Sequence, residues 1–254
     1  MTPPSTDSPT APSLDASLYD DAPPNWRDEL VIPDVSDLVT EDDTPVDNLL
    51  QEKLQRFLVQ CLYSSLKCDT PFLAAADVGL FYAIAQSPLV PDVMLSLGVS
   101  MPQDWREKRK RSYFIWEFGK PPDVAIEIVS NKKGGELGDK LEKYAQAGVA
   151  YYVVFDPMTL LGEQRLQAYG LHEGCYSPLE ETWLDNVQLG LTLWDGTFED
   201  MQATWLRWCD RDGNLLLTGD ERAEQESQRA EQERQRANRL AELLRSQGIN
   251  PDDV

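Results

Sequence analysis

The sequence has few of the residues that most often build metal sites and nucleophilic sites. Its 254 residues include one histidine and four cysteines. A single histidine excludes a multi-histidine metal site, and His172 lies in a segment, Leu171 to Gly174, that is predicted to be a hairpin turn. The cysteines form no Cys-x-x-Cys pair, which predicts reduced thiols and argues against a zinc site; they are Cys61, Cys68, Cys175 and Cys209. The chemistry must therefore come mainly from carboxylates, lysines and hydroxyls.

The chain also lacks long apolar runs and an excess of positive charge. No run approaches the roughly 18 apolar residues of a membrane-spanning helix, and the first residues are polar and proline-rich, unlike a signal peptide. We therefore expect a cytoplasmic protein with no membrane partner. With 23 basic against 44 acidic side chains, the net charge of −21 argues against a protein that simply coats nucleic acid. Its 41% hydrophobic and 9% aromatic residues are sufficient for a core.

Composition divides the chain into three parts. Residues 1–45 hold eight prolines and eleven acidic residues but one basic residue, so they are predicted to be a mostly disordered acidic tail. Residues 46–219 alternate apolar and turn segments, and their length suits one domain with one core. Residues 220–254 are predicted to form a charged helix.

This C-terminal segment contains a seven-residue repeat. Four residues, Ala223, Ala230, Ala237 and Leu244, fall at the same repeat position. A repeat of seven is typical of a helix that can enter a coiled coil. Because the repeated position is mostly alanine, two interpretations stay open: a solvated single helix, and a helix through which the protein forms a homodimer.

The central part predicts an α/β domain with a mixed sheet. Apolar residues recur at helical spacing over residues 49–62, and a second helix is predicted over residues 136–147, closed by Gly148. The second helix joins two apolar segments, which predicts that they are neighbouring parallel strands. The strands are predicted over residues 72–76, 78–83, 93–97, 112–117, 124–129, 151–155, 164–169, 175–179, 187–194 and 205–217.

One of these strands carries a charge among apolar residues. Alternation places Val124, Ile126 and Ile128 on one face and Glu127 on the other. A buried carboxylate is costly unless it is paired or binds a metal, and an ion pair with a lysine is one open interpretation. Asp92 opens another strand, and Lys140 lies near the start of the following helix. Two carboxylates and a lysine would suit Mg²⁺ with a phosphate substrate, although spacing alone leaves other uses open.

Taken together, five segments resemble a known family. They cover residues 91–92, 111–120, 121–130, 139–149 and 151–157, with the sequences PD, RSYFIWEFGK, PPDVAIEIVS, DKLEKYAQAGV and YYVVFDP. Their ordered series of an aspartate, Glu-x-x-Ser, Lys-x-x-x-Tyr and Asp-Pro resembles the bacterial putative restriction endonuclease family, formerly a domain of unknown function. That family belongs to the PD-(D/E)XK nuclease superfamily.

The resemblance implies a restriction-endonuclease-like fold, a mixed β-sheet flanked by helices, with the C-terminal heptad-repeat helix added to it. It also implies that Asp92 and Glu127 are ligands of Mg²⁺ or Mn²⁺ and that Lys140 is catalytic with them. The superfamily usually has its lysine two residues after the glutamate, where this chain has Val129. The lysine is therefore expected at Lys140 in the next helix.

Some positions stay open under this resemblance. The alternatives to Lys140 are Lys132 and Lys133. Family members often carry a histidine or glutamate in the first helix, and the residues that could replace it here are Asp47, Gln51 and Glu52. Ser130 and Asp156 follow their strands and are expected mainly to shape turns.

The sequence contains two further charged motifs. Residues 106–111 contain five basic side chains and one acidic one, and they could contact phosphate or form a solvated loop. Residues 210–221 carry acidic residues at calcium-loop spacing, but the position that needs glycine is Leu215, so a hairpin turn is expected instead.

Two functions of different classes follow. The first is a divalent-metal-dependent endonuclease that hydrolyses DNA phosphodiester bonds, with RNA as substrate left open. The second is a catalytically impaired nuclease-fold protein that acts as an interaction or assembly module. The series Asp92, Glu127 and Lys140 favours the enzyme, whereas the acidic charge favours the module, because DNA affinity depends mainly on phosphate neutralisation.

Overall fold

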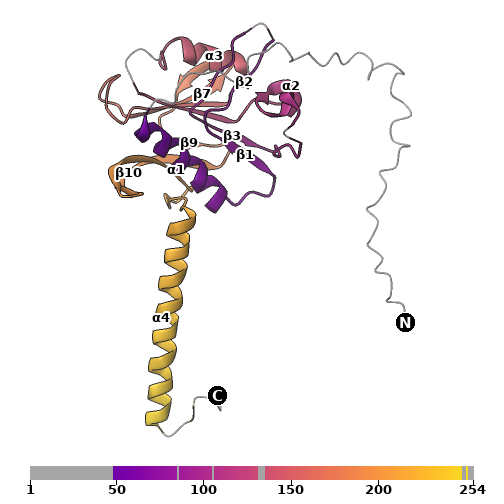
Figure 1. The fold of residues 1–254 in the computed structure, drawn as a ribbon. Helices are drawn as coiled ribbons and strands as arrows, with labels where there is room; N and C mark the ends of the chain where they lie inside the picture. Colours follow the sequence, from indigo (N-terminus) through magenta and orange to yellow (C-terminus); the bar gives the residue numbers. More distant parts are fainter. Residues whose placement is uncertain (1–47, 85, 105, 131–134, 248–249, 251–254) are drawn as a thin grey trace, which may run out of the picture. The chain divides into compact units, whose positions relative to one another are not determined.

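A computed structural model of the chain describes residues 48–84, 86–104, 106–130, 135–247 and 250 (Figure 1). The predicted acidic tail, residues 1–45, lies outside the described residues. Within the described part, none of the helices combines the length and the apolar character needed to cross a membrane.

The first helix, α1 (Leu49–Ser65), forms where helical periodicity predicts it. The side chain of Asn48 caps its first turn by accepting a hydrogen bond from the Gln51 backbone N–H at 3.0 Å. One face is buried, including Leu54, Phe57 and Leu58, and the opposite face is solvated. Hydrophobic burial along this face therefore fixes which side of α1 meets the sheet.

The central sheet has six strands in the order β1-β3-β5-β6-β7-β8. Their bounds are β1 (Phe72–Ala75), β3 (Val93–Leu97), β5 (Val124–Ile128), β6 (Tyr151–Phe155), β7 (Leu166–His172) and β8 (Cys175–Pro178). Only β5 and β6 pair in parallel; the other neighbours are antiparallel. Helix α3 (Asp139–Ala147) connects β5 to β6 and ends at Gly148, whose φ of 79° suits a helix C-terminus. The predicted parallel connection and mixed sheet are confirmed.

Two smaller sheets complete the fold. One contains β9 (Trp183–Leu184), β10 (Leu189–Phe198) and β11 (Met201–Cys209), and the other pairs β2 (Leu80–Phe81) with β4 (Tyr113–Phe114). A short 3-10 helix, η2 (Lys108–Lys110), precedes β4, and α2 (Ile115–Phe118) follows it.

Three strand predictions are wrong in extent. The segment 112–117 contains the two-residue β4 and then the start of α2, because its aromatic and β-branched residues are compatible with the spacing of a strand and with that of a helix. Gly119, at φ 77°, ends the helical turn. The segment 78–83 contains only β2. The strand predicted over residues 205–217 ends at Cys209. There the side chain of Asp210 stabilises a turn by accepting hydrogen bonds from the backbone N–H groups of Asp212 and Asn214. That turn agrees with the rejection of a calcium loop.

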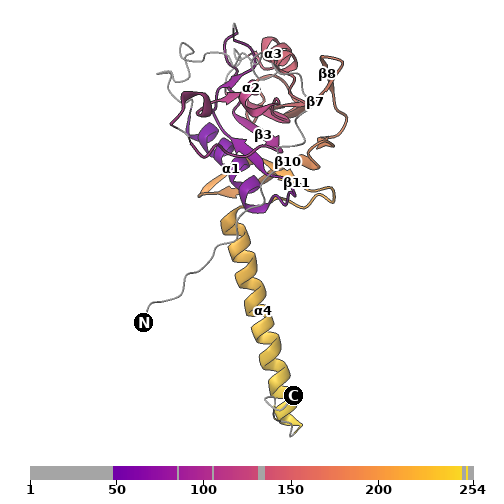
Figure 2. The same cartoon turned by 90° about the vertical axis from the view of Figure 1, so that its right-hand side faces the viewer.

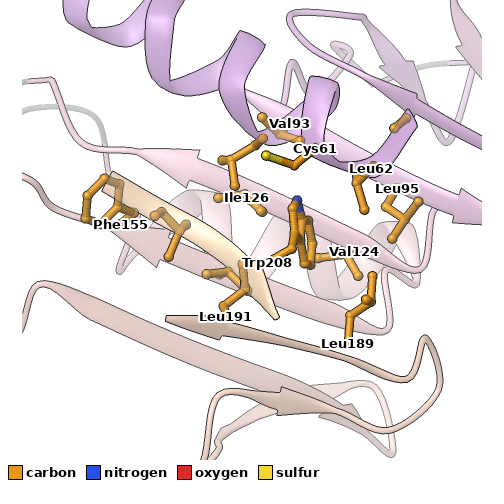
Figure 3. Close-up of a cluster of buried hydrophobic side chains, with 14 of the residues drawn as sticks. Cys61, Leu62, Val93, Leu95, Val124, Ile126, Phe155, Leu189, Leu191 and Trp208 are labelled. Atoms are coloured by element: carbon orange, nitrogen blue, oxygen red, sulfur yellow. The ribbon is translucent and has the colours of Figure 1, made fainter. Parts of the chain in front are cut away.

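The central sheet is buried on both faces. On one face Val124 and Ile126 pack in a cluster with Leu62 of α1 and Trp208 of β11 (Figure 3). On the other, Ala125 and Val129 belong to a second cluster that includes Tyr144 and Ala147 of α3. Both views place α1 and the β10–β11 hairpin on the opposite side of the sheet from α3 (Figures 1 and 2). A charged side chain on β5 therefore lies in an almost wholly apolar layer.

The heptad-repeat segment forms a long helix, α4 (Gly219–Ser246). Its first turn has a capping box in which Thr218 and Glu221 exchange side-chain to backbone hydrogen bonds. The Glu221 carboxylate also accepts a hydrogen bond from each of the two terminal nitrogens of the buried Arg207, both at 2.8 Å. The Arg207 guanidinium lies 4.9 Å from the Phe57 and Trp194 ring centroids. An ion pair between the buried Arg207 and the half-buried Glu221 therefore holds the start of α4 against β11.

We expect Arg207→Ala to lower the free energy of unfolding by about 3 kcal/mol, because it leaves the Glu221 carboxylate without its buried partner and removes the guanidinium from two aromatic rings. Urea unfolding followed by circular dichroism measures this change. The matched control is Arg229→Ala, which removes an exposed ion pair on α4 and should change stability by less than about 0.5 kcal/mol. Equal effects of the two substitutions would contradict the anchoring role of Arg207.

Candidate active site

The pairing of β3 with β5 brings two carboxylates together. Val93 pairs with Ile126, and the same antiparallel register continues to Asp92 opposite Glu127. Both side chains are buried, with Asp92 6% and Glu127 2% exposed. The backbone N–H of Ile128 donates to Asp92 Oδ2 at 2.5 Å, so the aspartate lies directly beside the glutamate's strand. Local sheet geometry thus places the two predicted metal ligands at one point.

Helix α3 adds the predicted lysine. Lys140 Nζ donates to Glu127 Oε2 at 2.8 Å, and the Tyr144 hydroxyl donates to Glu127 Oε1 at 2.6 Å. Lys140 and Tyr144 are four residues apart and so lie on one face of the helix. The structure therefore brings Asp92, Glu127 and Lys140 together. The alternatives Lys132 and Lys133 lie outside the described residues.

Helix α1 contributes two amides. Gln51 Nε2 and Gln55 Nε2 donate to Asp92 Oδ1 at 2.7 and 2.8 Å, again from positions one turn apart. Among the three first-helix alternatives, Gln51 is the one that the structure places at the carboxylates. Glu52 instead pairs with Arg56 on the exposed side of α1, and Asp47 lies outside the described residues.

Two further residues of the site, Gln55 and Glu136, are not predicted from the sequence. The Gln-x-x-x-Gln spacing in an otherwise apolar helix face is the signal that could have found Gln55. Glu136 is 5% exposed, its Oε1 is 3.7 Å from Lys140 Nζ, and its backbone carbonyl accepts a hydrogen bond from Tyr152. It precedes Lys140 by four residues, so it supplies a second carboxylate to the lysine from just before α3.

Burial dominates the electrostatics of the carboxylates. Desolvation, together with the charge of Asp92, raises the pKa of Glu127 to about 7 against the opposing effects of Lys140 and Tyr144. Desolvation also raises the pKa of Asp92, although the Ile128 N–H and the two glutamine amides oppose it. Burial lowers the pKa of Lys140, but Glu127, Glu136 and Asp92 together outweigh that effect and raise it. Among the described residues, the carboxylates of the site thus outnumber the one cation, Lys140, that lies beside them.

The donor set fits a hard divalent cation. Within the residues that the structure describes, no group of three or more His, Cys, Asp or Glu side chains is placed to hold a metal. However, Mg²⁺ is commonly held by one or two carboxylates together with water. Asp92 and Glu127 supply two, and Gln51 Oε1 is a buried oxygen with no hydrogen-bond partner in the described part of the chain. A cation here would satisfy that oxygen and balance the excess negative charge.

The remaining candidates lie outside this cluster or serve the backbone. Asp156 is fully buried and its Oδ2 accepts from the Leu161 N–H at 2.6 Å, which fixes the loop after β6. Ser130 lies two residues after the end of β5 and is half-buried. His172 is exposed and pairs with Cys175 at the predicted hairpin turn. In the basic segment 106–111, Glu107 is paired with Arg109 and Lys110.

A mixed sheet with buried carboxylates and a lysine at the meeting point of β3, β5 and α3 defines the class of this protein, an α/β protein with a carboxylate–lysine site. Its sequence matches the model of the Uma2 family, described as a putative restriction endonuclease, over residues 41–198. The chain belongs to that family.

One solved structure is similar, that of a putative nuclease belonging to DUF820 from Anabaena variabilis ATCC 29413. The two chains share 16% sequence identity, and the match covers 55% of this chain and 72% of that chain with a TM-score of 0.39. No curated protein matches the chain.

The raised pKa of Glu127 predicts how stability depends on pH when metal is removed. As pH rises above about 4.5, the unfolded state loses this proton first, so ionisation of Glu127 favours unfolding until the folded state also ionises near pH 7. Glu127→Gln removes this effect. In chelator, its unfolding free energy should therefore rise relative to the parent by about 2 to 3 kcal/mol between about pH 5 and pH 8.

Urea unfolding at the two pH values measures this difference. Glu142→Gln, an exposed position on α3, is the matched control and should leave the pH dependence of the parent unchanged. A parent and Glu127→Gln variant with parallel pH profiles would show that Glu127 titrates alike in the folded and unfolded states.

Proposed function

We propose that the protein is a divalent-metal-dependent endonuclease that hydrolyses DNA phosphodiester bonds with Mg²⁺ or Mn²⁺. The observation that carries the proposal is the convergence of Asp92, just before β3, with Glu127 of β5 and Lys140 of α3: Lys140 donates to Glu127, and the backbone N–H of Ile128, next to Glu127, donates to Asp92. Membership in a restriction endonuclease family supports the same reaction class. We take residues 46–219 as the nuclease-like domain and the cytoplasm as its compartment.

In this proposal Asp92 and Glu127 hold the metal, with Gln51 Oε1 as a further oxygen. The metal, when bound, would lower the pKa of a water molecule and stabilise charge on the phosphate. The two glutamine amides and the Ile128 N–H hold the Asp92 carboxylate in one orientation. Tyr144 does the same for Glu127 from the opposite side of the sheet. Both carboxylates are thus positioned before a cation arrives.

Lys140 acts as a hydrogen-bond donor in this proposal. Its raised pKa keeps the proton on Nζ at neutral pH, so it does not accept a proton from water. Its side chain is 34% exposed, whereas that of Glu127 is 3% exposed, so the ammonium is the group that an incoming substrate can reach. It can therefore orient the attacking water and donate to a phosphate oxygen as negative charge develops there.

The basic segment 106–111 is the proposed phosphate contact. Its five basic side chains outnumber the one acidic residue, Glu107, even though that residue pairs with two of them. Local positive charge offsets repulsion between an anionic substrate and a chain of net charge −21.

The same overall charge supports the second candidate function, an interaction or assembly module that keeps the nuclease fold without its activity. A strongly acidic protein gains less from phosphate neutralisation than a typical nucleic-acid-binding protein. The two functions differ in whether the carboxylate site binds metal and supports cleavage.

We expect the full chain to cleave supercoiled plasmid DNA with Mg²⁺ or Mn²⁺ and chelator to stop the reaction. Glu127→Ala and Lys140→Ala should each lower the rate by at least about a hundredfold, since each removes a group positioned at the reacting phosphate. The matched controls are Glu142→Ala and Lys143→Ala, two exposed residues of α3, and they should cleave at the parental rate.

Equal cleavage by the parent and both site variants would place the activity elsewhere or in a contaminant. No cleavage by any of them, together with no Mn²⁺ binding by the parent, would favour the interaction module.

Metal binding without catalysis tests the role of the first helix. Gln51→Leu removes both a buried oxygen without a hydrogen-bond partner in the described part of the chain and a donor to Asp92, so we expect the Mn²⁺ affinity to fall by about 10- to 100-fold in calorimetry. Gln60→Leu, a half-buried position on the same helix away from the carboxylates, is the control. If the two variants bind Mn²⁺ equally, Gln51 has no part in the metal site.

A further inference from the structure

The surface of α4 is not used by the proposed nuclease. None of its 28 residues is buried. Beyond Arg222, the ion pairs and side-chain hydrogen bonds that α4 makes within the described part of the chain join two residues of the helix itself. Leu240 and Leu243 are 59% and 60% exposed. The helix is therefore attached at its first turn and leaves an apolar end uncovered.

Charge is distributed unevenly along this helix. Residues 219–233 contain six acidic and two basic side chains, a net charge of −4. Residues 234–246 contain four basic side chains and one acidic one, a net charge of +3. The two halves of α4 are therefore complementary to each other in sign.

The helix dipole explains only part of this pattern. Acidic residues near the start and basic residues near the end of a helix are favourable, but the effect falls off within the first and last turns. Here the segregation continues through the middle, where Glu231 and Glu233 are followed directly by Arg234 and Arg236. A second constraint is needed for these central residues.

We propose that α4 pairs with α4 of a second copy of this chain in antiparallel orientation. In that arrangement the acidic half of each helix lies against the basic half of the other, at both ends of the pair. A parallel pair would instead place each acidic half against its own copy, and like charges at such contacts are destabilising.

The apolar residues follow the same division. The repeat position holds alanine in the first three repeats, at Ala223, Ala230 and Ala237, and leucines gather only at the end, at Leu240, Leu243 and Leu244. An antiparallel pair sets the small side chains of one helix against the large side chains of the other, which fills the seam at both ends. A parallel pair would set alanine against alanine at this repeat position throughout the first three repeats.

Charge reversal tests the pairing in the full-length protein. The variant R234E/R236E/R239E makes the basic half acidic, and the variant E226R/E231R/E233R makes the acidic half basic. Sedimentation should show the parent as a dimer and each variant alone as a monomer, with self-association weakened by at least about tenfold. Mixing the two variants should restore the dimer, since each then offers a charge opposite to the other.

A variant with three exposed charges reversed on the rest of the protein, K67E/K143E/R211E, controls for net charge and should remain a dimer. A parent that is monomeric at every concentration, or a charge-reversed variant that stays dimeric, overturns the pairing.

Disulfide trapping tests the orientation, in a background where the exposed Cys68 and Cys175 are replaced by serine. Copies carrying Ala223→Cys should crosslink to copies carrying Leu240→Cys and not to each other. Crosslinking between two Ala223→Cys copies would establish a parallel pair and overturn the proposal. Neither outcome depends on whether the protein cleaves DNA, so this result and that of the cleavage assay stand apart.

Discussion

The burial of Glu127 within β5 constrains the rest of the site. A carboxylate in the middle of an apolar strand needs partners, and every group around it serves that need: Lys140 and Tyr144 from α3 hold its two oxygens. Asp92 lies opposite it and requires donors of its own, which α1 supplies as Gln51 and Gln55. Residues of α1, β5 and α3, which are far apart in sequence, thus meet around the buried carboxylates of Asp92 and Glu127.

Most of the architecture could be predicted from sequence because its signals are local and periodic. The helix at residues 49–65, the strands β3, β5 and β6, and the helix that ends at Gly148 each follow from spacing and one capping residue. The strand predictions were wrong in extent where a short segment is compatible with the residue spacing of both a strand and a helix. Residues 112–117 alternate well enough for a strand, yet the pairing of β4 with β2 lasts only two residues before the chain turns into α2.

The site was predicted in part. Asp92, Glu127 and Lys140 could be selected because each breaks a local rule or fits a family motif, and the structure places them together. Glu136 could not be selected, since a glutamate in a loop breaks no local rule, and the spacing of Gln51 and Gln55 gains its meaning only when the fold shows that both amides face Asp92. Which first-helix residue lies at the carboxylates could be decided only once it was known which face of α1 is buried. That burial places Gln51 inward and Glu52 outward.

Helix α1 contacts the carboxylate site through its first turns and the start of α4 through its last turn. Its first turns hold Asp92 through two glutamines, and its last turn accepts Arg222 at the Ser64 carbonyl and donates from Ser65 to the Leu217 carbonyl at 2.6 Å. A hydrogen-bonded helix of 17 residues is a stiff rod of roughly 25 Å. The same rod therefore sets the positions of the two amides at one end and of the first turn of α4 at the other.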